Sequence, residues 1–199
     1  MVLTVSAERM GLLRWWLFFL LLLLPLGLLV EGLLTDNLGA DPAKYIVKEL
    51  GFWAICWLWL TLAVKPARKF LGWRWLIRYR RMFGLSAFFY AVLHLLAFAT
   101  FLLGWRWDIL MTELTKRPYI VVGLLALLLL LPLAITSTKG MQRRLGRRWK
   151  KLHTLIYPAS LLVLLHFIWQ IRSDFLQQLI FAILLAILLG YQLYLKRRS

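Results

Sequence analysis

Cysteine and acidic residues are scarce in this chain of 199 residues, and each shortage excludes a class of protein. The single cysteine, Cys56, cannot form an intrachain disulfide and has no partner for a cysteine-based metal site. No Gly-rich dinucleotide fingerprint is present, so we expect no nicotinamide-binding domain. Only eight residues are Asp or Glu, against 25 Lys or Arg, and none of the eight falls inside a long apolar run.

Hydrophobic residues are abundant, at 62% of the chain, well above the share found in soluble domains. Six apolar runs approach the roughly 20 residues that a helix needs to cross the hydrocarbon core of a bilayer. The loops between them are too short for a soluble domain, and no internal repeat is evident. The sequence therefore predicts an all-α membrane protein, a single transmembrane domain over residues 1–199 built as a six-helix bundle. The runs are Leu13–Val30, Phe52–Val64, Met82–Leu103, Tyr119–Thr136, Leu152–Ile171 and Phe175–Leu195.

The first run could instead belong to a signal peptide, because Arg9 and Arg14 accompany it. However, the run is long for such a segment, and no small-x-small cleavage site follows it. We expect a retained first span.

The positive charge lies in alternate loops. Nineteen basic residues, accompanied only by Glu8, occupy the two chain ends and residues 65–81 and 139–151, whereas the other segments carry six basic and seven acidic residues. The positive-inside rule then places both termini in the cytoplasm. We expect membrane lipid rather than nucleic acid as the partner of these charges. Apolar Phe70, Trp73 and Leu76 alternate with cations, which predicts a short interfacial helix or a docking surface for a cytoplasmic partner or phosphorylated cofactor.

Two histidines, His94 and His166, fall deep inside apolar runs. An ionisable side chain in hydrocarbon is costly and indicates function, and imidazole is a common axial ligand of haem iron. His94 lies thirteen residues beyond Arg81 and His166 fifteen beyond Lys151, or ~20 and ~22 Å along parallel helices. This common depth predicts a haem held by two imidazoles, which leaves no open position for substrate and suits electron transfer. The alternative is a purely structural role, in which both histidines are hydrogen-bonded packing residues.

The third histidine, His153, lies near the basic end of the fifth run and is a candidate ligand for a second, shallow haem. Thirteen residues separate it from His166, which places the two side chains ~140° apart on a straight helix. No histidine lies at the matching depth of the third run, so the opposite ligand would be Arg80, water or none. His153 could equally be an interfacial residue.

Several segments resemble the MsrQ (YedZ) family. They are the Arg-rich stretch Ile135–Tyr157, Leu38–Lys44, Arg80–Leu85 with His94–Leu95, and Thr115–Tyr119, the last departing from the family pattern by one residue. The resemblance implies a ferric-reductase-like transmembrane fold in the bacterial inner membrane and b-type haem, with His94, His153 and His166 matching the family's histidines. It also implies FMN, a quinone pool or cytoplasmic flavin reductase as electron donor, and a periplasmic molybdopterin methionine-sulfoxide reductase subunit as acceptor.

The expected function is therefore that of a membrane cytochrome with one or two haems, which carries electrons outward to a catalytic partner. Two alternatives stay open. One is a self-contained transmembrane reductase of ferric iron or oxygen, and the other is a haem-free transport or assembly protein with structural histidines. Carboxylates would be expected in the spans of a coupled transporter, and the six runs contain none.

Overall fold

The computed structural model describes residues 2–170 and 175–198, and helices account for nearly all of them. The long elements are α1 (Val2–Leu34), α2 (Pro42–Phe70), α3 (Arg80–Ala97), α5 (Tyr119–Ile135), α8 (Ile156–Trp169) and α9 (Leu176–Arg198). Shorter elements are η1 (Arg74–Arg78), the π-helical η2 (Phe98–Leu102) that continues α3, α4 (Trp107–Lys116), α6 (Lys139–Leu145), α7 (Arg147–Leu152) and η3 (His153–Leu155).

The helices confirm a multi-pass membrane protein. Five are long and apolar enough to cross a membrane, and the number rises to six if α4 and α5, which meet at a bend of 104°, are counted as one span. The fifth predicted run is interrupted at its basic end by the turn η3, and its predicted last residue, Ile171, lies outside the described residues. The expected all-α bundle is therefore confirmed, and the number of spans depends on how the α4–α5 bend is counted.

The second span is longer at both ends than the apolar run Phe52–Val64. Asp41 caps the start of α2 by accepting a hydrogen bond from the backbone N–H of Lys44, and Pro42 occupies the first turn, where its missing donor costs nothing. The helix therefore includes Glu49, whose carboxylate accepts a hydrogen bond from Nε1 of Trp53. At the other end α2 continues through Pro66 to Phe70, so only η1 corresponds to the predicted interfacial helix.

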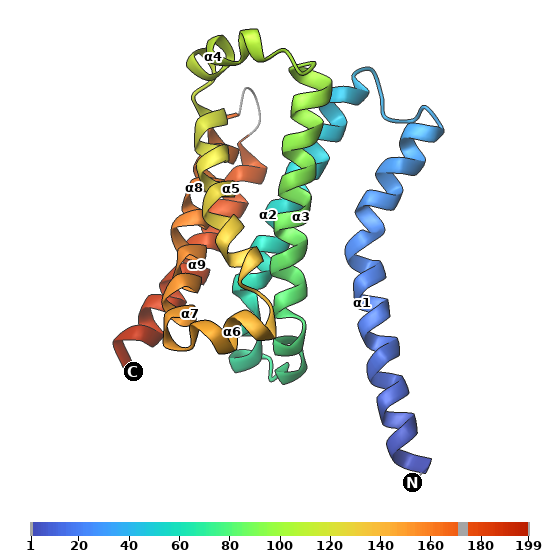
Figure 1. Ribbon diagram of the computed structural model, residues 1–199, viewed down its shortest axis with the longest axis vertical. Helices are drawn as coiled ribbons and strands as arrows, with labels where there is room; N and C mark the ends of the chain where they lie inside the picture. The colour runs from blue at the N-terminus through green and yellow to red at the C-terminus, as the bar shows by residue number, and fades with distance from the viewer. Residues whose placement is uncertain (1, 171–174, 199) are drawn as a thin grey trace.

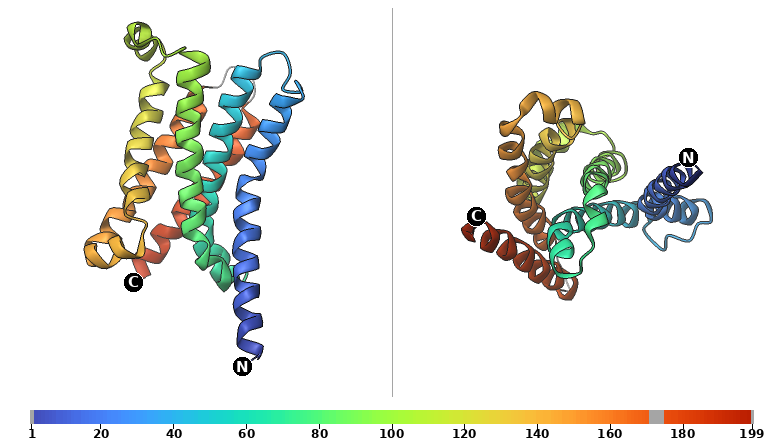
Figure 2. Two further views of the ribbon diagram at one scale, coloured as in Figure 1. Left: turned by 45° about the vertical axis from the view of Figure 1, so that its right-hand side comes forward. Right: turned by 90° about the horizontal axis from the view of Figure 1, so that it is seen from below.

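The bundle is built from two helix pairs. α2 packs along α3, α5 packs along α8, and α9 contacts both α2 and α8 (Figure 1). α3 and α8 run in the same direction, with α2, α5 and α9 antiparallel to them (Figure 2). The loops rich in Lys and Arg, the start of α1 and the end of α9 all lie at one end of the bundle, called the basic end below.

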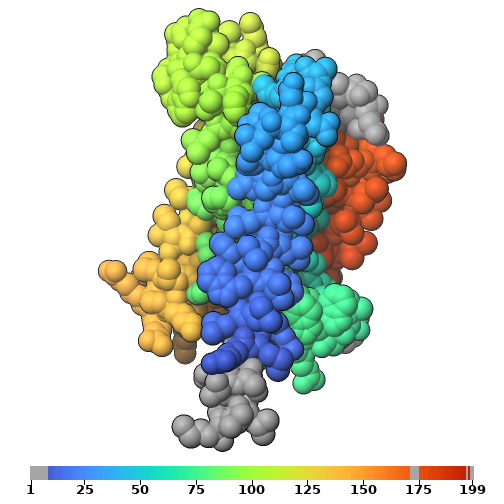
Figure 3. Space-filling model, turned by 90° about the vertical axis from the view of Figure 1, so that its right-hand side faces the viewer, coloured from blue at the N-terminus to red at the C-terminus, as the bar shows by residue number. Residues whose placement is uncertain are grey.

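The first helix covers one side of this bundle along its length (Figure 3). It contacts α2 and α3, and its Leu22 is buried, while most of its leucines are exposed, as expected of side chains that face lipid. Small residues allow the helices to pack closely at the centre of the bundle. Ala87 of α3 and Ala159 of α8 are 1% and 0% exposed, beside the fully buried Val64.

A tyrosine hydroxyl is inserted into the backbone of α1 beside its proline. Pro25 has no N–H to donate, which weakens the helix at this turn. The buried hydroxyl of Tyr90 on α3 donates to the carbonyl of Leu22 at 2.8 Å and accepts from the backbone N–H of Leu26 at 3.2 Å. Tyr90 thus satisfies backbone groups that hydrocarbon could not, and it fixes α1 against α3.

We expect Tyr90→Phe to lower the thermal stability of the detergent-solubilised protein. The loss should be roughly 0.6 to 2 kcal/mol, because interhelical hydrogen bonds in membranes have about that strength and α1 can partly re-form its own bond. Circular dichroism during heating measures the change. Tyr45→Phe, on an exposed side chain of α2, is the matched control, and equal melting temperatures for the two variants would contradict this role for Tyr90.

Candidate functional site

The structure brings the imidazole rings of His94 and His166 close together. His94 projects from α3 and His166 from α8, and the centres of their rings are 6.1 Å apart with the ring planes at 82°. Both side chains are half-buried. The two imidazoles form what we call the deep site, and they belong to different helix pairs.

Each imidazole of the deep site is oriented by a backbone carbonyl of the helix beside it. Nδ1 of His94 lies 2.8 Å from the carbonyl oxygen of Val47 on α2, and Nδ1 of His166 lies 2.7 Å from that of Tyr119 on α5. A carbonyl can only accept, so Nδ1 carries the proton and donates it. Nε2 of each ring is therefore the nitrogen with a free lone pair, as a metal ligand requires.

Two glycines make these close contacts possible. Gly51 lies four residues after Val47, and Gly123 lies four residues after Tyr119. A Cβ atom at Gly51 would come within 3.0 Å of Nδ1 of His94, and one at Gly123 within 2.7 Å of Nδ1 of His166. Each imidazole therefore occupies space that any larger residue would fill.

The two halves of the deep site repeat one arrangement, which the sequence analysis did not detect. In both, the histidine follows the carbonyl residue by 47 positions and the glycine lies one helical turn after that carbonyl. Ala87 and Ala159, each seven positions before its histidine, are both fully buried. No internal repeat was expected from the sequence, because only these few positions recur between two otherwise leucine-rich segments.

The residues of the deep site fit a metal bound between two imidazoles. A metal ion lies about 2 Å from a coordinating imidazole nitrogen and the ring centre about 1 Å further, so two opposed rings have centres about 6 Å apart. The observed 6.1 Å agrees with this separation. Within the described residues, no group of three or more His, Cys, Asp or Glu side chains could hold a metal ion, so a protein-ligated zinc site has no support there.

Gln170, which the sequence analysis missed, also contacts the deep site. Its amide nitrogen lies 2.8 Å from Nε2 of His166, one turn further along the chain at the end of α8. Since Nδ1 of His166 is the protonated nitrogen, the amide donates to the Nε2 lone pair. The Gln170 side chain is exposed and can rotate away, so a metal ligated by His166 would replace this hydrogen bond.

His153 lies at the basic end, apart from the deep site. It begins the turn η3, its ring stacks on that of Trp149 at 3.9 Å, and its Nδ1 lies 3.1 Å from the Trp149 carbonyl oxygen. The half-buried guanidinium of Arg80 is near enough to act on it electrostatically. The 3-10 turn also changes the angular relation to His166 that a straight helix would impose. We call His153 and Arg80 the shallow site.

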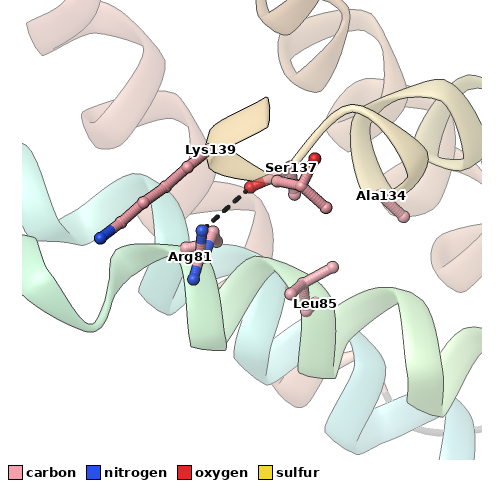
Figure 4. Close-up of a pocket in the computed structure, with 6 residues that line it drawn as sticks. Arg81, Leu85, Ala134, Ser137 and Lys139 are labelled. Carbon is pink, nitrogen blue, oxygen red and sulfur yellow. Dashed lines mark hydrogen bonds between the residues drawn. The ribbon is translucent and has the colours of Figure 1, made fainter. Parts of the chain in front are cut away.

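A cavity of about 400 Å³ opens at the basic end between α3 and the residues that follow α5. Arg81 crosses this space and donates a hydrogen bond to the carbonyl oxygen of Ser137 at 3.2 Å (Figure 4). Arg81 is therefore tied to the segment that follows α5. The cavity is lined by Arg81, Leu85, Ala134, Ser137, Thr138 and Lys139.

Charge is distributed unequally between the two ends of the bundle. The three ion pairs found among the described residues join Lys44 to Asp41, Arg106 to Asp108 and Arg117 to Glu113, all at the end opposite to the basic end. The hydrogen bond from Arg106 lowers the pKa of Asp108, and the Asp108 carboxylate raises the pKa of Arg106. No such neutralisation occurs among the described cations of the basic end.

The chain is similar in sequence to known membrane proteins. Residues 50–164 match the family model described as ferric reductase like transmembrane component. A protein-methionine-sulfoxide reductase heme-binding subunit MsrQ from Xanthomonas euvesicatoria pv. vesicatoria is 51% identical over 162 residues, which are 81% of this chain and 74% of the relative. Proteins of the same name from Xanthomonas campestris pv. campestris and Azospira oryzae are 50% and 44% identical, covering 83% and 87% of this chain and 75% and 76% of the relatives.

The helical bundle and the family match define a ferric-reductase-like transmembrane protein, as the sequence predicted. Identity near one half over most of both chains narrows this class further. The chain belongs to the MsrQ family.

Proposed function

We propose that this protein is the haem-binding membrane subunit of a methionine-sulfoxide reductase system and that it carries electrons across the bacterial inner membrane. The observation that carries the proposal is the deep site, where two imidazoles with fixed Nδ1 protons face each other at the separation of opposed metal ligands. The printed name of the relatives, a heme-binding subunit, supports the same ligand. The whole chain, residues 1–199, then acts as one haem-binding unit.

In the deep site, His94 and His166 would hold a b-type haem between the two helix pairs. Haem supplies the one-electron chemistry, and its two protein ligands leave no position for substrate. The chain's own contribution is orientation. The carbonyls of Val47 and Tyr119 hold the rings.

In the shallow site, His153 would hold a second haem. The opposite ligand would be Arg80 or water, or that position would have no ligand. Its Nδ1 bond to Trp149 leaves Nε2 available, as in the deep site. Two haems at the two depths would divide the width of the bilayer into shorter steps for an electron.

Electrons would enter at the basic end and leave at the opposite end. The concentration of unneutralised Lys and Arg at one end supports a cytoplasmic location for it and for both termini. The family resemblance supports FMN as a further cofactor, a quinone pool or cytoplasmic flavin reductase as donor, and a periplasmic molybdopterin subunit as acceptor. Methionine sulfoxide itself would be reduced on that partner.

A self-contained transmembrane reductase of ferric iron or oxygen is the second candidate, because the matching family model is described as ferric reductase like. Reduction of ferric chelates by the purified protein, without any partner, would favour it. Electron delivery only in the presence of the catalytic subunit would favour the first proposal.

The test is an oxidised-minus-reduced visible spectrum of the purified protein, together with haem quantification as the pyridine haemochrome. One or two b-type haems per chain with a low-spin spectrum are expected, since both axial positions of the deep haem would be filled. Absence of haem after expression with haem precursor would refute the proposal.

We expect His153→Ala to remove at most the shallow haem and to leave the deep one unchanged. His153 lies in η3 at the basic end, apart from the deep site. None of the deep-site contacts involves His153. Haem-to-protein stoichiometry measures the effect, with a decrease from two haems to one as the expected result. An unchanged stoichiometry would identify His153 as an interfacial residue instead.

A further inference from the structure

A second cavity, of about 760 Å³, lies at the basic end between the last turns of α2, the turn η1 and the last turns of α9. Four of the side chains that line it are cations, namely Lys65, Arg68, Lys69 and Arg74. It is separate from the deep and shallow sites, because none of the histidines or Arg80 lines it.

The lysines of this basic pocket are held by neutral groups. Nζ of Lys65 donates to the side-chain oxygen of Gln192 at 3.1 Å. Nζ of Lys69 lies within about 6 Å of three aromatic ring centres, those of Phe70, Tyr191 and Tyr194. Such contacts position the ammonium groups without cancelling their charge.

No protein carboxylate neutralises the pocket within the part of the chain that the structure describes. The ion pairs found there all lie at the opposite end, and Glu8 is the only acidic residue in the basic segments of the sequence. Four like charges lining one cavity repel one another, so a bound anion would be strongly favoured. Among the described residues the pocket therefore has four cations and no counter-ion.

The remaining lining residues indicate what kind of anion this is. Ile77, Leu195 and the ring of Tyr191 form an apolar side of the pocket. Phe70, Leu71 and Trp73, which join α2 to η1, are exposed apolar residues next to it. A ligand with an anionic head and an apolar body fits both parts, and basic pockets between transmembrane helices bind the head groups of anionic lipids.

We propose that this basic pocket binds a phosphate group, and that the phosphate belongs to an anionic phospholipid of the surrounding leaflet. Arg68 and Arg74 contact the phosphate, Lys65 and Lys69 complete its charge neutralisation, and the acyl chains lie along the apolar side. FMN carries the same chemical group, so the experiment distinguishes the two sources. The proposal does not depend on haem binding.

The test is native mass spectrometry of the detergent-purified full chain, titrated separately with phosphatidylglycerol, phosphatidylethanolamine and FMN. The wild type should bind phosphatidylglycerol in preference to phosphatidylethanolamine. Arg68→Gln with Arg74→Gln should weaken phosphatidylglycerol binding about 30-fold, since each cation near a membrane surface contributes a factor of about five. Both positions are exposed, so the double variant should retain its helix content and haem.

The matched control is Arg143→Gln with Arg147→Gln, which removes the same charge from exposed positions of α6 and α7 at the same end of the bundle. It should bind phosphatidylglycerol as the wild type does. Equal weakening in both double variants would reveal a general charge effect and overturn the pocket. If Arg68→Gln with Arg74→Gln abolished FMN binding but left phosphatidylglycerol binding unchanged, the phospholipid would be overturned as ligand. The phosphate would then be assigned to the flavin.

Discussion

Replacement of His94 or His166 by alanine is expected to abolish the deep haem while the protein still folds and inserts. Each substitution removes one of two opposed ligands and leaves the other imidazole in place. The helix pairs do not rely on these rings alone for packing, because α2 contacts α3 and α5 contacts α8 at many other positions. Haem content per chain should fall by one haem in either variant, measured as the pyridine haemochrome.

Free imidazole provides the control for this prediction. His94→Ala leaves an empty volume opposite Gly51, and added imidazole can occupy that volume and restore a six-coordinate spectrum. A misfolded variant would not be rescued. A full haem complement in both single variants, without added imidazole, would show that the two histidines do not ligate the haem.

Gly123→Ala is expected to weaken haem binding although residue 123 itself has no ligand atom. The new methyl carbon would lie 2.7 Å from Nδ1 and 2.8 Å from Cε1 of His166, closer than such atoms can approach. The imidazole must move and lose its bond to the Tyr119 carbonyl. Loss of an orienting partner typically costs a metal site about 10- to 100-fold in affinity, so haem titration of the purified apoprotein should show a shift of that size.

Other glycines of the chain supply controls for this substitution. Gly27→Ala and Gly190→Ala place the same methyl group on α1 and α9, where nothing lies within 4 Å. Gly51→Ala should have an intermediate effect, because its methyl carbon would lie 3.0 Å from Nδ1 of His94. If Gly123→Ala and Gly190→Ala bind haem equally well, the close approach at Gly123 is not required.

The repeated half-site explains how a protein with few polar groups in its spans could hold a cofactor accurately. Nδ1 of each imidazole has one hydrogen bond, and that bond goes to a backbone carbonyl of a tightly packed neighbouring helix. Backbone atoms of a helix move less than a side chain would, so the orientation of each ring is fixed without a buried charge. The same device on two helix pairs leaves Nε2 of each ring as the nitrogen that can bind a metal.

Much of the bundle could be predicted from hydropathy. Every apolar run corresponds to a helix of the structure, because each is rich in leucine and long enough to satisfy its backbone only as a helix in hydrocarbon. The predictions were less accurate at the ends of the runs. α2 begins at Pro42 rather than Phe52, because a cap and a proline, not hydropathy, decide where that helix starts.

The candidate ligands could be proposed from the sequence, but their partners could not. His94 and His166 were conspicuous as imidazoles in apolar runs at similar depth. Val47 and Tyr119 contribute only main-chain oxygens, which leave no mark in a sequence, and Gly51 and Gly123 look like ordinary small residues in a membrane helix. The equal spacing of each glycine before its histidine was the one available signal.

The sequence by itself determined the all-helical class, the membrane setting, the basic end and the three histidines, because hydropathy and charge act locally along the chain. Only the tertiary structure decided that His94 and His166 lie close together, that Arg81 binds the Ser137 carbonyl, and that Tyr90 bridges the backbone beside Pro25. These relations depend on which faces of separate helices meet. That choice is set by close packing around small residues and by single hydrogen bonds, whose partners lie dozens of positions apart in the chain.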